Sequence, residues 1–277
     1  MNSLTPVQVI NGLTLKRDDL YAPFGETGVN GGKLRQCMML LNNLNGKYES
    51  VLSYCSLHSP QAPITAAAAK AHGMDCTILY GGTNADRIKQ MPMPRLAAQY
   101  GARIVVAAKS GRHTVLHSKA KIMAKESSSF IVQYGINLTE HAEVLFQAVA
   151  AQVENIPDEI PNLVLTCGSG ITATGVLLGI HFFGKQIQQI HLIGTAPNRE
   201  RFIHSQLSAA GADRKICYHD LFNSAGFVYE KPVHQNWGGL QLHPQYEAKA
   251  MQWFKASKLK PEETLFWIVG AEPSTRG

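Results

Sequence analysis

The sequence lacks any long apolar run. No stretch approaches the roughly eighteen apolar residues that a membrane-spanning helix needs, and the first residues lack the charged and apolar regions of a signal peptide. The five cysteines are scattered, odd in number and without a CxxC pair, which argues against a disulfide framework and against a zinc site. We therefore expect a cytoplasmic protein with no membrane segment and no bound metal.

Acidic residues are scarcer than basic ones. There are 20 Asp and Glu against 26 Lys and Arg, so the net charge is +6. This excess favours an anionic partner, which could be a phosphate cofactor, an acidic substrate or nucleic acid. The segment 109–125 contains no acid and five cations, which are Lys109, Arg112, Lys119, Lys121 and Lys125. It is either a solvated helix face or a surface for a polyanion such as DNA.

Short apolar runs alternate with helix-forming segments along most of the chain. Strands are predicted at 51–54, 76–80, 103–106, 130–132, 163–166, 187–194 and 265–269. Helices are predicted between them, among others at 65–71, 94–100, 140–153 and 173–181. This alternation is typical of parallel sheets covered by helices on both faces, so the predicted fold class is α/β. Residues 197–240 show no pattern that assigns elements.

One lysine follows two glycines directly ahead of a predicted helix, in the stretch Asn30-Gly31-Gly32-Lys33. Glycines allow a sharp turn and a close approach of the backbone to a ligand. Partial burial of a lysine at such a corner disfavours its charged form and lowers its pKa. An amine must lose its proton before it can form a Schiff base with an aldehyde. Taken alone, the stretch is also compatible with a turn that carries a solvated lysine.

A second glycine-rich turn joins the predicted strand at 163–166 to the helix that follows. The free N–H groups of such a turn, together with the positive end of the helix dipole, suit a phosphate group. Ser169 and Thr172 could add hydroxyl donors. The turn is neither a GxGxxG motif nor a Walker A motif, and a plain tight turn would look similar.

Five motifs resemble, in order and approximate spacing, those of the fold-type II enzymes that use pyridoxal 5'-phosphate (PLP). They are KRDDL at 16–20, GGK-x-R at 31–35, S-x-x-A-x-x-T-A-A-A-A at 59–69, GSG-x-T at 168–172 and P-x-Y-E-x-K at 244–249. The first of them, taken alone, could equally be a surface cluster of ion pairs. Within this superfamily the chain is most similar to the group of 1-aminocyclopropane-1-carboxylate (ACC) deaminase and D-cysteine desulfhydrase.

The resemblance implies an architecture and a set of site residues. Two three-layer α/β domains with parallel-rich sheets would hold PLP in the cleft between them. The larger PLP-binding domain would comprise 1–41 and 151–277, and the smaller one 42–150. Lys33 would bind PLP as a Schiff base, Glu247 would face the pyridine nitrogen, and Ser59 and Tyr246 would act as acid–base groups. The phosphate would be held by Gly168, Ser169, Gly170 and Thr172. A homodimer is also implied.

The chain departs from the family pattern on the substrate side. Pro60 and Gln61 stand where the family has Asn and His, and neither can supply the amide or the acid–base group expected there. Ile171 replaces the second glycine of the usual phosphate loop, and Val269-Gly270-Ala271 replaces Thr-Gly-Gly. About one helix is missing between Val228 and Leu242. The cofactor side is therefore expected to be kept and the substrate side rebuilt.

These observations predict a PLP-dependent lyase or deaminase that cleaves a bond at or next to the α-carbon of a small amino acid, by deamination or β-elimination. An alternative is a decarboxylase-type enzyme that acts on an amino acid attached to thymine in bacteriophage DNA. The basic segment 109–125 would hold this DNA, and the enzyme would work in the cytoplasm of the host cell. Weaker alternatives are a PLP-binding protein without catalysis and a regulatory nucleic-acid-binding protein on a decayed enzyme fold.

Overall fold

The computed structural model describes residues 3–25, 28–44, 46–136, 139–270 and 273. Contacts divide the chain into two compact units. Unit 1 comprises Met1–Tyr21 and Leu145–Glu272, and unit 2 comprises Ala22–Val144 and Pro273–Gly277. This division differs from the predicted one in the segments 22–41, 145–150 and 273–277, which contacts assign to the opposite unit. Lys33 is therefore grouped with the smaller α/β sheet.

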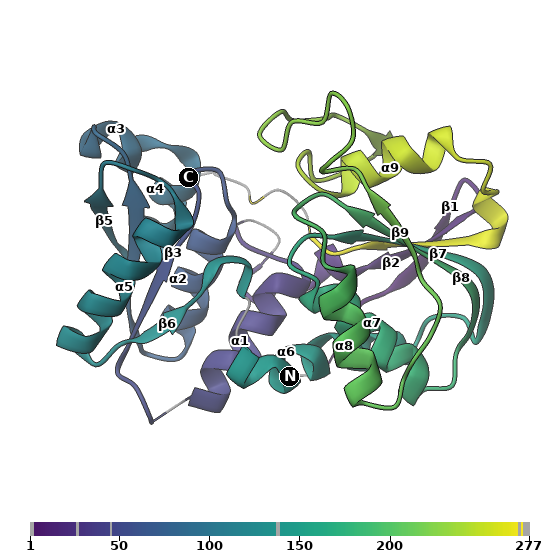
Figure 1. The fold of residues 1–277 in the computed structure, drawn as a ribbon, viewed down its shortest axis with the longest axis horizontal. Coiled ribbons are helices and arrows are strands. Elements are labelled where there is room, and N and C mark those ends of the chain that lie inside the picture. Colours follow the sequence, from purple (N-terminus) through teal and green to yellow (C-terminus); the bar gives the residue numbers. More distant parts are fainter. Residues whose placement is uncertain (1–2, 26–27, 45, 137–138, 271–272, 274–277) are drawn as a thin grey trace. The chain divides into compact units, whose positions relative to one another are not determined.

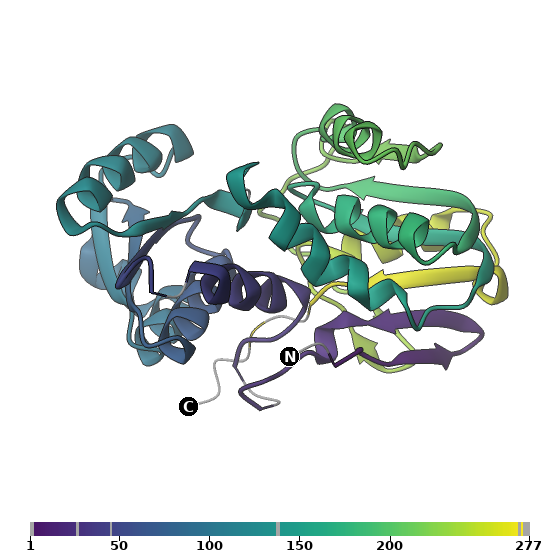
Figure 2. The ribbon, with the colours of Figure 1, turned by 90° about the horizontal axis from the view of Figure 1, so that it is seen from below.

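Unit 1 is built on a six-stranded sheet with the order β1-β2-β12-β7-β8-β9 (Figures 1 and 2). The strands are β1 (Val7–Ile10), β2 (Leu13–Arg17), β12 (Thr264–Ile268), β7 (Glu159–Cys167), β8 (Gln186–Gly194) and β9 (Cys217–Asp220). The hairpin β1–β2 is antiparallel, and all other neighbouring pairs of this sheet are parallel. The predicted parallel-rich α/β architecture is confirmed here.

Alternate residues of the central strands of unit 1 build two separate cores. Leu165 and Trp267 pack on the side of the helices α6 (Ala142–Ala150), α7 (Ile171–Phe182) and α8 (Glu200–Ala209). Their neighbours Val164 and Phe266 pack on the side of α9 (Glu247–Ala256), across the sheet (Figure 1). Because helices cover both faces of the sheet, the residues that point to either face are apolar. This explains why the sequence of each predicted strand is a continuous apolar run.

Unit 2 contains a four-stranded, fully parallel sheet with the order β5-β4-β3-β6. Its strands are β3 (Ser50–Tyr54), β4 (Asp75–Gly81), β5 (Arg103–Ala108) and β6 (Phe130–Val132). The helix α5 (His113–Ser127) packs on Leu52, Tyr54 and Leu79. Helix α2 (Gln61–Ala71) packs against β3 and β4, and α1 (Gly32–Leu44) and α4 (Pro92–Gln99) pack against α2.

Several elements differ from the sequence-based expectations in extent. Helix α2 begins at Gln61, four residues before the predicted start, because Pro60 is its N-cap and Pro63 falls in its first turn, where a missing N–H costs nothing. The region 197–240 holds α8, β9 and a small ribbon of β10 (Asn236–Trp237) and β11 (Leu240–Gln241). A short α3 (Ala85–Gln90) was not predicted.

Short 3-10 turns complete the structure, at Asp18–Leu20, Tyr134–Ile136, Thr139–His141, Ala151–Val153 and Pro261–Glu263. Among the described helices, none has both the length and the apolar character required to cross a bilayer. Of the departures noted in the sequence, the one at 269–271 includes Ala271, which lies outside the described residues.

Candidate active site

Lys33 lies in the first turn of α1 in unit 2. Gly31 precedes the helix with φ 90°, a left-handed conformation that an L side chain rarely adopts, so the glycine allows the chain to turn into the helix at this point. The lysine side chain is partly buried, and its Nζ donates to the carbonyl oxygen of Gly135 at 3.5 Å. The helix start thus presents this amine to the turn that follows β6.

Ser59 lies in the same unit, in the loop between β3 and α2. It is buried, with 7% of its surface exposed, and its Oγ accepts a hydrogen bond from the backbone N–H of Gln61 at 3.3 Å. The next residue, Pro60, is the N-cap of α2. Gln61 turns its side chain toward β3 and the turn 133–135. Unit 2 therefore carries two of the predicted site residues, Lys33 and Ser59.

The glycine-rich turn of unit 1 lies between β7, which ends at Cys167, and α7, which begins at Ile171. Gly170 is the N-cap of α7, with φ 87°. The conformation favours glycine, and a Cβ at this position would lie tightly, at 3.0 Å from a ring carbon of Phe202 and 3.3 Å from the Cβ of Arg199. Ile171 is fully buried in the core, which explains how the loop accommodates it in place of a glycine.

Two hydroxyl groups of this turn are buried and have no hydrogen-bond partner within the part of the chain that the structure describes. They are Ser169 Oγ and Thr172 Oγ1. A buried hydroxyl without a partner carries a desolvation cost of about 1–3 kcal/mol, which a bound acceptor would remove. Both groups stand at the N-terminus of α7, where the helix dipole favours an anion. The turn therefore fits the phosphate group of PLP.

A further buried hydroxyl near this turn was missed by the sequence analysis. Thr195 follows β8 directly, is fully buried, and donates its backbone N–H to the carbonyl of Cys167 at 3.0 Å. Its Oγ1 has no partner among the residues described. Only the parallel pairing of β7 with β8 brings it beside the turn, so no local sequence signal marks it.

Glu247 is the first residue of α9 in unit 1. It is almost fully buried, and its Oε1 accepts a hydrogen bond from the backbone N–H of Val269 at 3.1 Å. Burial raises the pKa of this carboxyl to about 8, backbone N–H groups oppose the rise, and the nearby charge of Asp19 adds to it. A buried carboxyl of this kind suits the protonated ring nitrogen of PLP, with which it could share a proton.

The Asp19 just mentioned belongs to the KRDDL motif, and the structure corrects one interpretation of that motif. Lys16 and Asp18 have no exposed surface, and Arg17 and Asp19 form an ion pair at 2.7 Å that is also buried. A surface cluster of ion pairs is therefore wrong. The motif instead lies at the end of β2 and places Asp19 close to Glu247.

Tyr246 precedes Glu247 and has a partner that the sequence analysis missed. Its hydroxyl oxygen lies 2.6 Å from that of Tyr229, in the region that showed no pattern. Lys249 donates to the carbonyl oxygens of Val228 and Tyr229, at 3.1 and 2.8 Å. The lysine of the P-x-Y-E-x-K motif thus holds the segment that supplies Tyr229. Nothing local in the sequence around Tyr229 indicates this contact.

The predicted site residues consequently fall into two groups, each described within its own unit. Unit 2 holds Lys33 and Ser59, and unit 1 holds the phosphate-binding turn together with Tyr246 and Glu247. The residues fit PLP in type and local environment. When bound, this cofactor supplies an electron sink for the electron pair left at an α-carbon.

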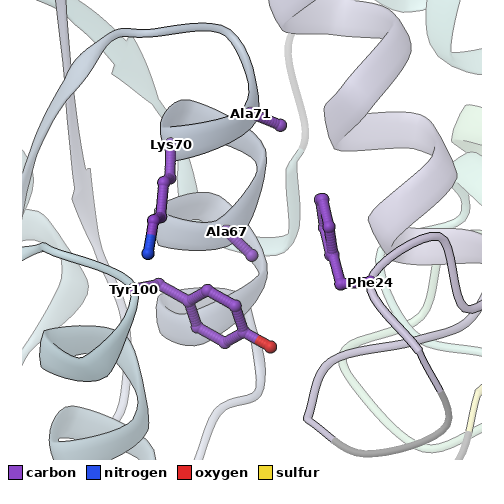
Figure 3. A pocket seen from close by; sticks show the side chains of 5 residues that line it. All are labelled: Phe24, Ala67, Lys70, Ala71 and Tyr100. Carbon is purple, nitrogen blue, oxygen red and sulfur yellow. The ribbon is translucent and has the colours of Figure 1, made fainter.

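Unit 2 also contains a cavity of about 300 Å³, shown in Figure 3. Its lining residues are Phe24, Ala67, Lys70, Ala71 and Tyr100, and the predicted site residues are not among them. The Tyr100 hydroxyl accepts a hydrogen bond from the N–H of Val29 at 3.4 Å and sits where a Cβ of Gly28 would be. One lining residue of the cavity, Tyr100, thus contacts residues 28 and 29, which precede Lys33 in the chain.

The basic segment 109–125 forms a loop and most of α5. All five of its cations are exposed, and α5 turns its apolar residues Leu116 and Ala120 toward the sheet. At the beginning of this helix, the ring of His113 packs on that of Tyr134 with centroids 3.8 Å apart. Tyr134 adjoins Gly135, whose carbonyl contacts Lys33, so the basic helix starts beside the turn that carries this contact.

Comparisons with known proteins give consistent results. Residues 8–220 match the family model described as pyridoxal-phosphate dependent enzyme. A curated relative, the O-seryl-dTMP PLP-dependent decarboxylase of Salmonella phage ViI, is 28% identical over an alignment of 334 residues that covers 93% of this chain and 78% of that protein.

Similar solved structures include an ACC deaminase homologue, with a TM-score of 0.77, 21% identity, and 99% of this chain and 91% of that one covered. Maize serine racemase superposes with a TM-score of 0.63 at 16% identity, covering 97% and 88%. Threonine deaminase isoform 2 from Solanum lycopersicum gives a TM-score of 0.63 at 14% identity, covering 96% and 79%. At these identities the likeness concerns the fold, and it confirms the fold-type II architecture. The chain belongs to the family of pyridoxal-phosphate dependent enzymes, and PLP is its cofactor.

Proposed function

We propose that this enzyme removes the carboxyl group of an amino acid that is carried on a thymidine nucleotide in DNA. The observation that carries the proposal is the similarity, along 93% of the chain, to a relative named as an O-seryl-dTMP decarboxylase. The exposed basic segment 109–125 supports a DNA-borne substrate, because a small free amino acid, with its single α-carboxylate, does not need five exposed cations.

Each predicted site residue has a role in this reaction that its surroundings support. Lys33, partly buried and turned toward Gly135, is the covalent attachment point of PLP. Ser169 and Thr172 donate their unused hydroxyl hydrogens to the phosphate, together with the N–H groups at the start of α7. The carboxyl of Glu247, with its raised pKa, holds a proton at the ring nitrogen.

The proton balance of the reaction identifies what the remaining residues must do. Loss of carbon dioxide leaves an electron pair at the α-carbon, and one proton must be delivered there. Tyr246, hydrogen-bonded to Tyr229, is the proton-moving hydroxyl of unit 1, and Ser59 is the buried hydroxyl of unit 2. Gln61 cannot move a proton at neutral pH, so the residue that replaces the family's histidine has no part in this transfer.

Deamination or β-elimination of a small free amino acid is the competing function. It is favoured by the Tyr246-Glu247 pair, which resembles the pair of the ACC deaminase group. In that reaction a proton leaves the α-carbon, and ammonia with a keto acid is formed instead of carbon dioxide with an amine. A PLP-binding protein without catalysis would form neither set of products.

The products distinguish these functions. Purified protein with PLP would be incubated with an oligodeoxynucleotide that carries O-seryl groups on its thymines, and in parallel with free amino acids. We expect carbon dioxide and an aminoalkyl-modified nucleotide from the oligonucleotide, and no turnover by Lys33→Ala. Ammonia or sulfide release from free amino acids, with an inert oligonucleotide, would establish the competing function. A protein that turns yellow with PLP but turns over neither would overturn both.

DNA binding is tested separately by titration at two salt concentrations. The triple variant Arg112→Ala, Lys119→Ala, Lys121→Ala should bind more weakly and with a smaller salt dependence, by about one unit of log–log slope for each lost phosphate contact. The matched control replaces the exposed Arg201, Lys215 and Lys258 of unit 1 by alanine, with the same loss of charge. Equal affinity of the two triple variants would rule out α5 as the DNA-binding surface.

Two further features belong to the proposal. We propose a homodimer, which sedimentation analysis of the holoenzyme would test, and the cytoplasm of a phage-infected host cell as the site of action. The domain boundaries implied by the resemblance, 1–41 with 151–277 and 42–150, likewise stay a proposal, which limited proteolysis would test.

A further inference from the structure

The side chain of Gln61 makes three hydrogen bonds to two separate segments of unit 2, strand β3 and the turn 133–135. It is 6% exposed, and its Nε2 donates to Ser53 Oγ in β3 at 3.0 Å and to the carbonyl oxygen of Gln133 at 2.8 Å. Its Oε1 accepts from the N–H of Gly135 at 2.6 Å. All three hydrogen-bonding directions are used inside the protein, and both donors and the acceptor of the amide are satisfied.

The turn that Gln61 holds has an unusual backbone. Gly135 has φ 74°, and the next residue, Ile136, has φ 52° although it is β-branched and buried. A β-branched residue in the left-handed region is a genuine outlier that costs about 1–2 kcal/mol, so the surrounding contacts must maintain it. Gln61 binds the carbonyl of Gln133 and the N–H of Gly135, the first and last residues of the turn, and thus holds the two ends of the turn in place.

The same turn contacts the amine of Lys33. Gly135 offers its N–H to Gln61 and its carbonyl oxygen to Lys33 Nζ, so a single residue joins the two side chains. Ser59 is connected as well, because its Oγ accepts from the backbone N–H of Gln61. A shift of Gln61 would consequently move two groups together. They are the Gly135 carbonyl, which accepts from Lys33, and the Gln61 N–H, which donates to Ser59.

We propose that Gln61 is a positioning residue, which fixes the turn 133–135 so that the Gly135 carbonyl orients the amine of Lys33. An amide suits this role because it presents two donors and an acceptor and carries no charge at any working pH. A histidine offers only two ring nitrogens and a glutamate offers no donor when ionised.

The proposal rests on the proposed role of Lys33, and the test keeps the two apart. Gln61→Met has nearly the same shape and lacks all three hydrogen bonds. We expect the rate at which added PLP becomes trapped on Lys33 by borohydride to fall about tenfold, since misplaced reacting groups lose rate at this scale or more. We also expect the pH midpoint of the cofactor's absorbance to shift. Gln61→His, which keeps one donor and one acceptor, should show smaller changes of both.

Gln152→Met is the matched control. Gln152 is also fully buried and accepts from the N–H and the hydroxyl of Thr5, at 2.9 and 3.1 Å, but it lies in unit 1. Its loss should lower the thermal midpoint of the cofactor-free protein without changing the trapping rate or the absorbance midpoint. Unchanged trapping rate and absorbance midpoint in both Gln61 variants would overturn the positioning role. Trapping that persists in Lys33→Ala would instead overturn the proposed function.

Discussion

The hydroxyl oxygens of Tyr229 and Tyr246 lie 2.6 Å apart, although the two residues belong to different segments of unit 1. Their rings meet at 66° with centroids 6.2 Å apart, so the contact is made through the hydroxyl groups and not by stacking. When Tyr246 gives up a proton, the hydrogen of Tyr229 can stabilise the resulting negative charge. If Tyr246 moves the proton, as we propose, the two tyrosines should act together in that step.

Replacing Tyr229 by phenylalanine should lower kcat by about ten- to hundredfold, because a hydrogen bond to a charged group contributes about 1.5–3 kcal/mol. KM should change little, since the bond matters only while the proton moves. The control is Tyr48→Phe, which alters a partly exposed tyrosine of unit 2. Steady-state kinetics of the two variants with the same substrate would check this. An unchanged kcat would remove Tyr229 from the mechanism.

Lys249→Met should reproduce much of the Tyr229→Phe defect, because Lys249 donates to the carbonyls of Val228 and Tyr229. Amide hydrogen exchange in the 227–231 segment should become faster. If Lys249 acts through Tyr229, the double variant should be hardly worse than either single one, whereas additive losses would mean independent roles. Lys255→Met is the control, since this lysine of the same helix also donates to two acceptors, Gln235 and the carbonyl of Asn236.

The stability of the cofactor-free protein should fall as the pH rises from about 4.5 to about 8, the interval between the ordinary pKa of Glu247 and its raised value. Within this interval the folded state binds more protons than the unfolded state, so raising the pH favours unfolding by up to about 1.4 kcal/mol per pH unit for one group. Denaturant unfolding at several pH values would measure this slope. Glu247→Gln should flatten it, and Glu262→Gln, at an exposed position, should not.

Removing the hydroxyl groups of the phosphate-binding turn should weaken PLP binding without destabilising the cofactor-free protein. Ser169→Ala and Thr172→Val delete buried groups that have no partner in the described structure, so the free energy of unfolding should stay equal or rise by up to about 1 kcal/mol. Each should raise the dissociation constant for PLP about tenfold.

Thr174→Val is the contrasting variant, since its Oγ1 already donates to the carbonyl of Gly170 at 2.9 Å. It should lower the unfolding free energy of the cofactor-free protein by about 1 kcal/mol, the contribution of an ordinary hydrogen bond. Calorimetric unfolding and PLP titration by absorbance would measure the two quantities. Strong destabilisation by Ser169→Ala or Thr172→Val in the absence of PLP would contradict the assignment of their hydroxyls to the cofactor.

The sequence was informative wherever the chemistry is local. The turn before α1 and the turn after β7 each combine glycines, a strand or helix boundary and a functional side chain within six residues, so Lys33, Ser169 and Thr172 could be singled out. Their roles stay predictions, but the structure places each at a helix start. The parallel strands were also predictable, because burial on both faces leaves continuous apolar runs.

Contacts across long sequence separations could not be predicted in this way. Tyr229 meets Tyr246 from an irregular loop that Lys249 contacts, and Thr195 lies beside the phosphate-binding turn because β8 pairs with β7. Gln61 was recognised as a departure, but its purpose depends on a turn 72 to 74 residues further along the chain. Sequence patterns with periods of two or 3.6 residues carry no information on such pairs.

The position of β12 has a consequence for how the chain folds during synthesis. This strand, Thr264–Ile268, lies between β2 and β7 and is hydrogen-bonded to both. The sheet of unit 1 therefore cannot close until residue 268 has left the ribosome, and its early hairpin must wait with one edge unpaired. The sheet of unit 2 uses only strands between 50 and 132 and can form while the rest is being translated. Unit 2 should thus fold first. Until β12 is available, the unpaired edge of the β1–β2 hairpin can pair with other chains, so we expect this segment to need a chaperone most.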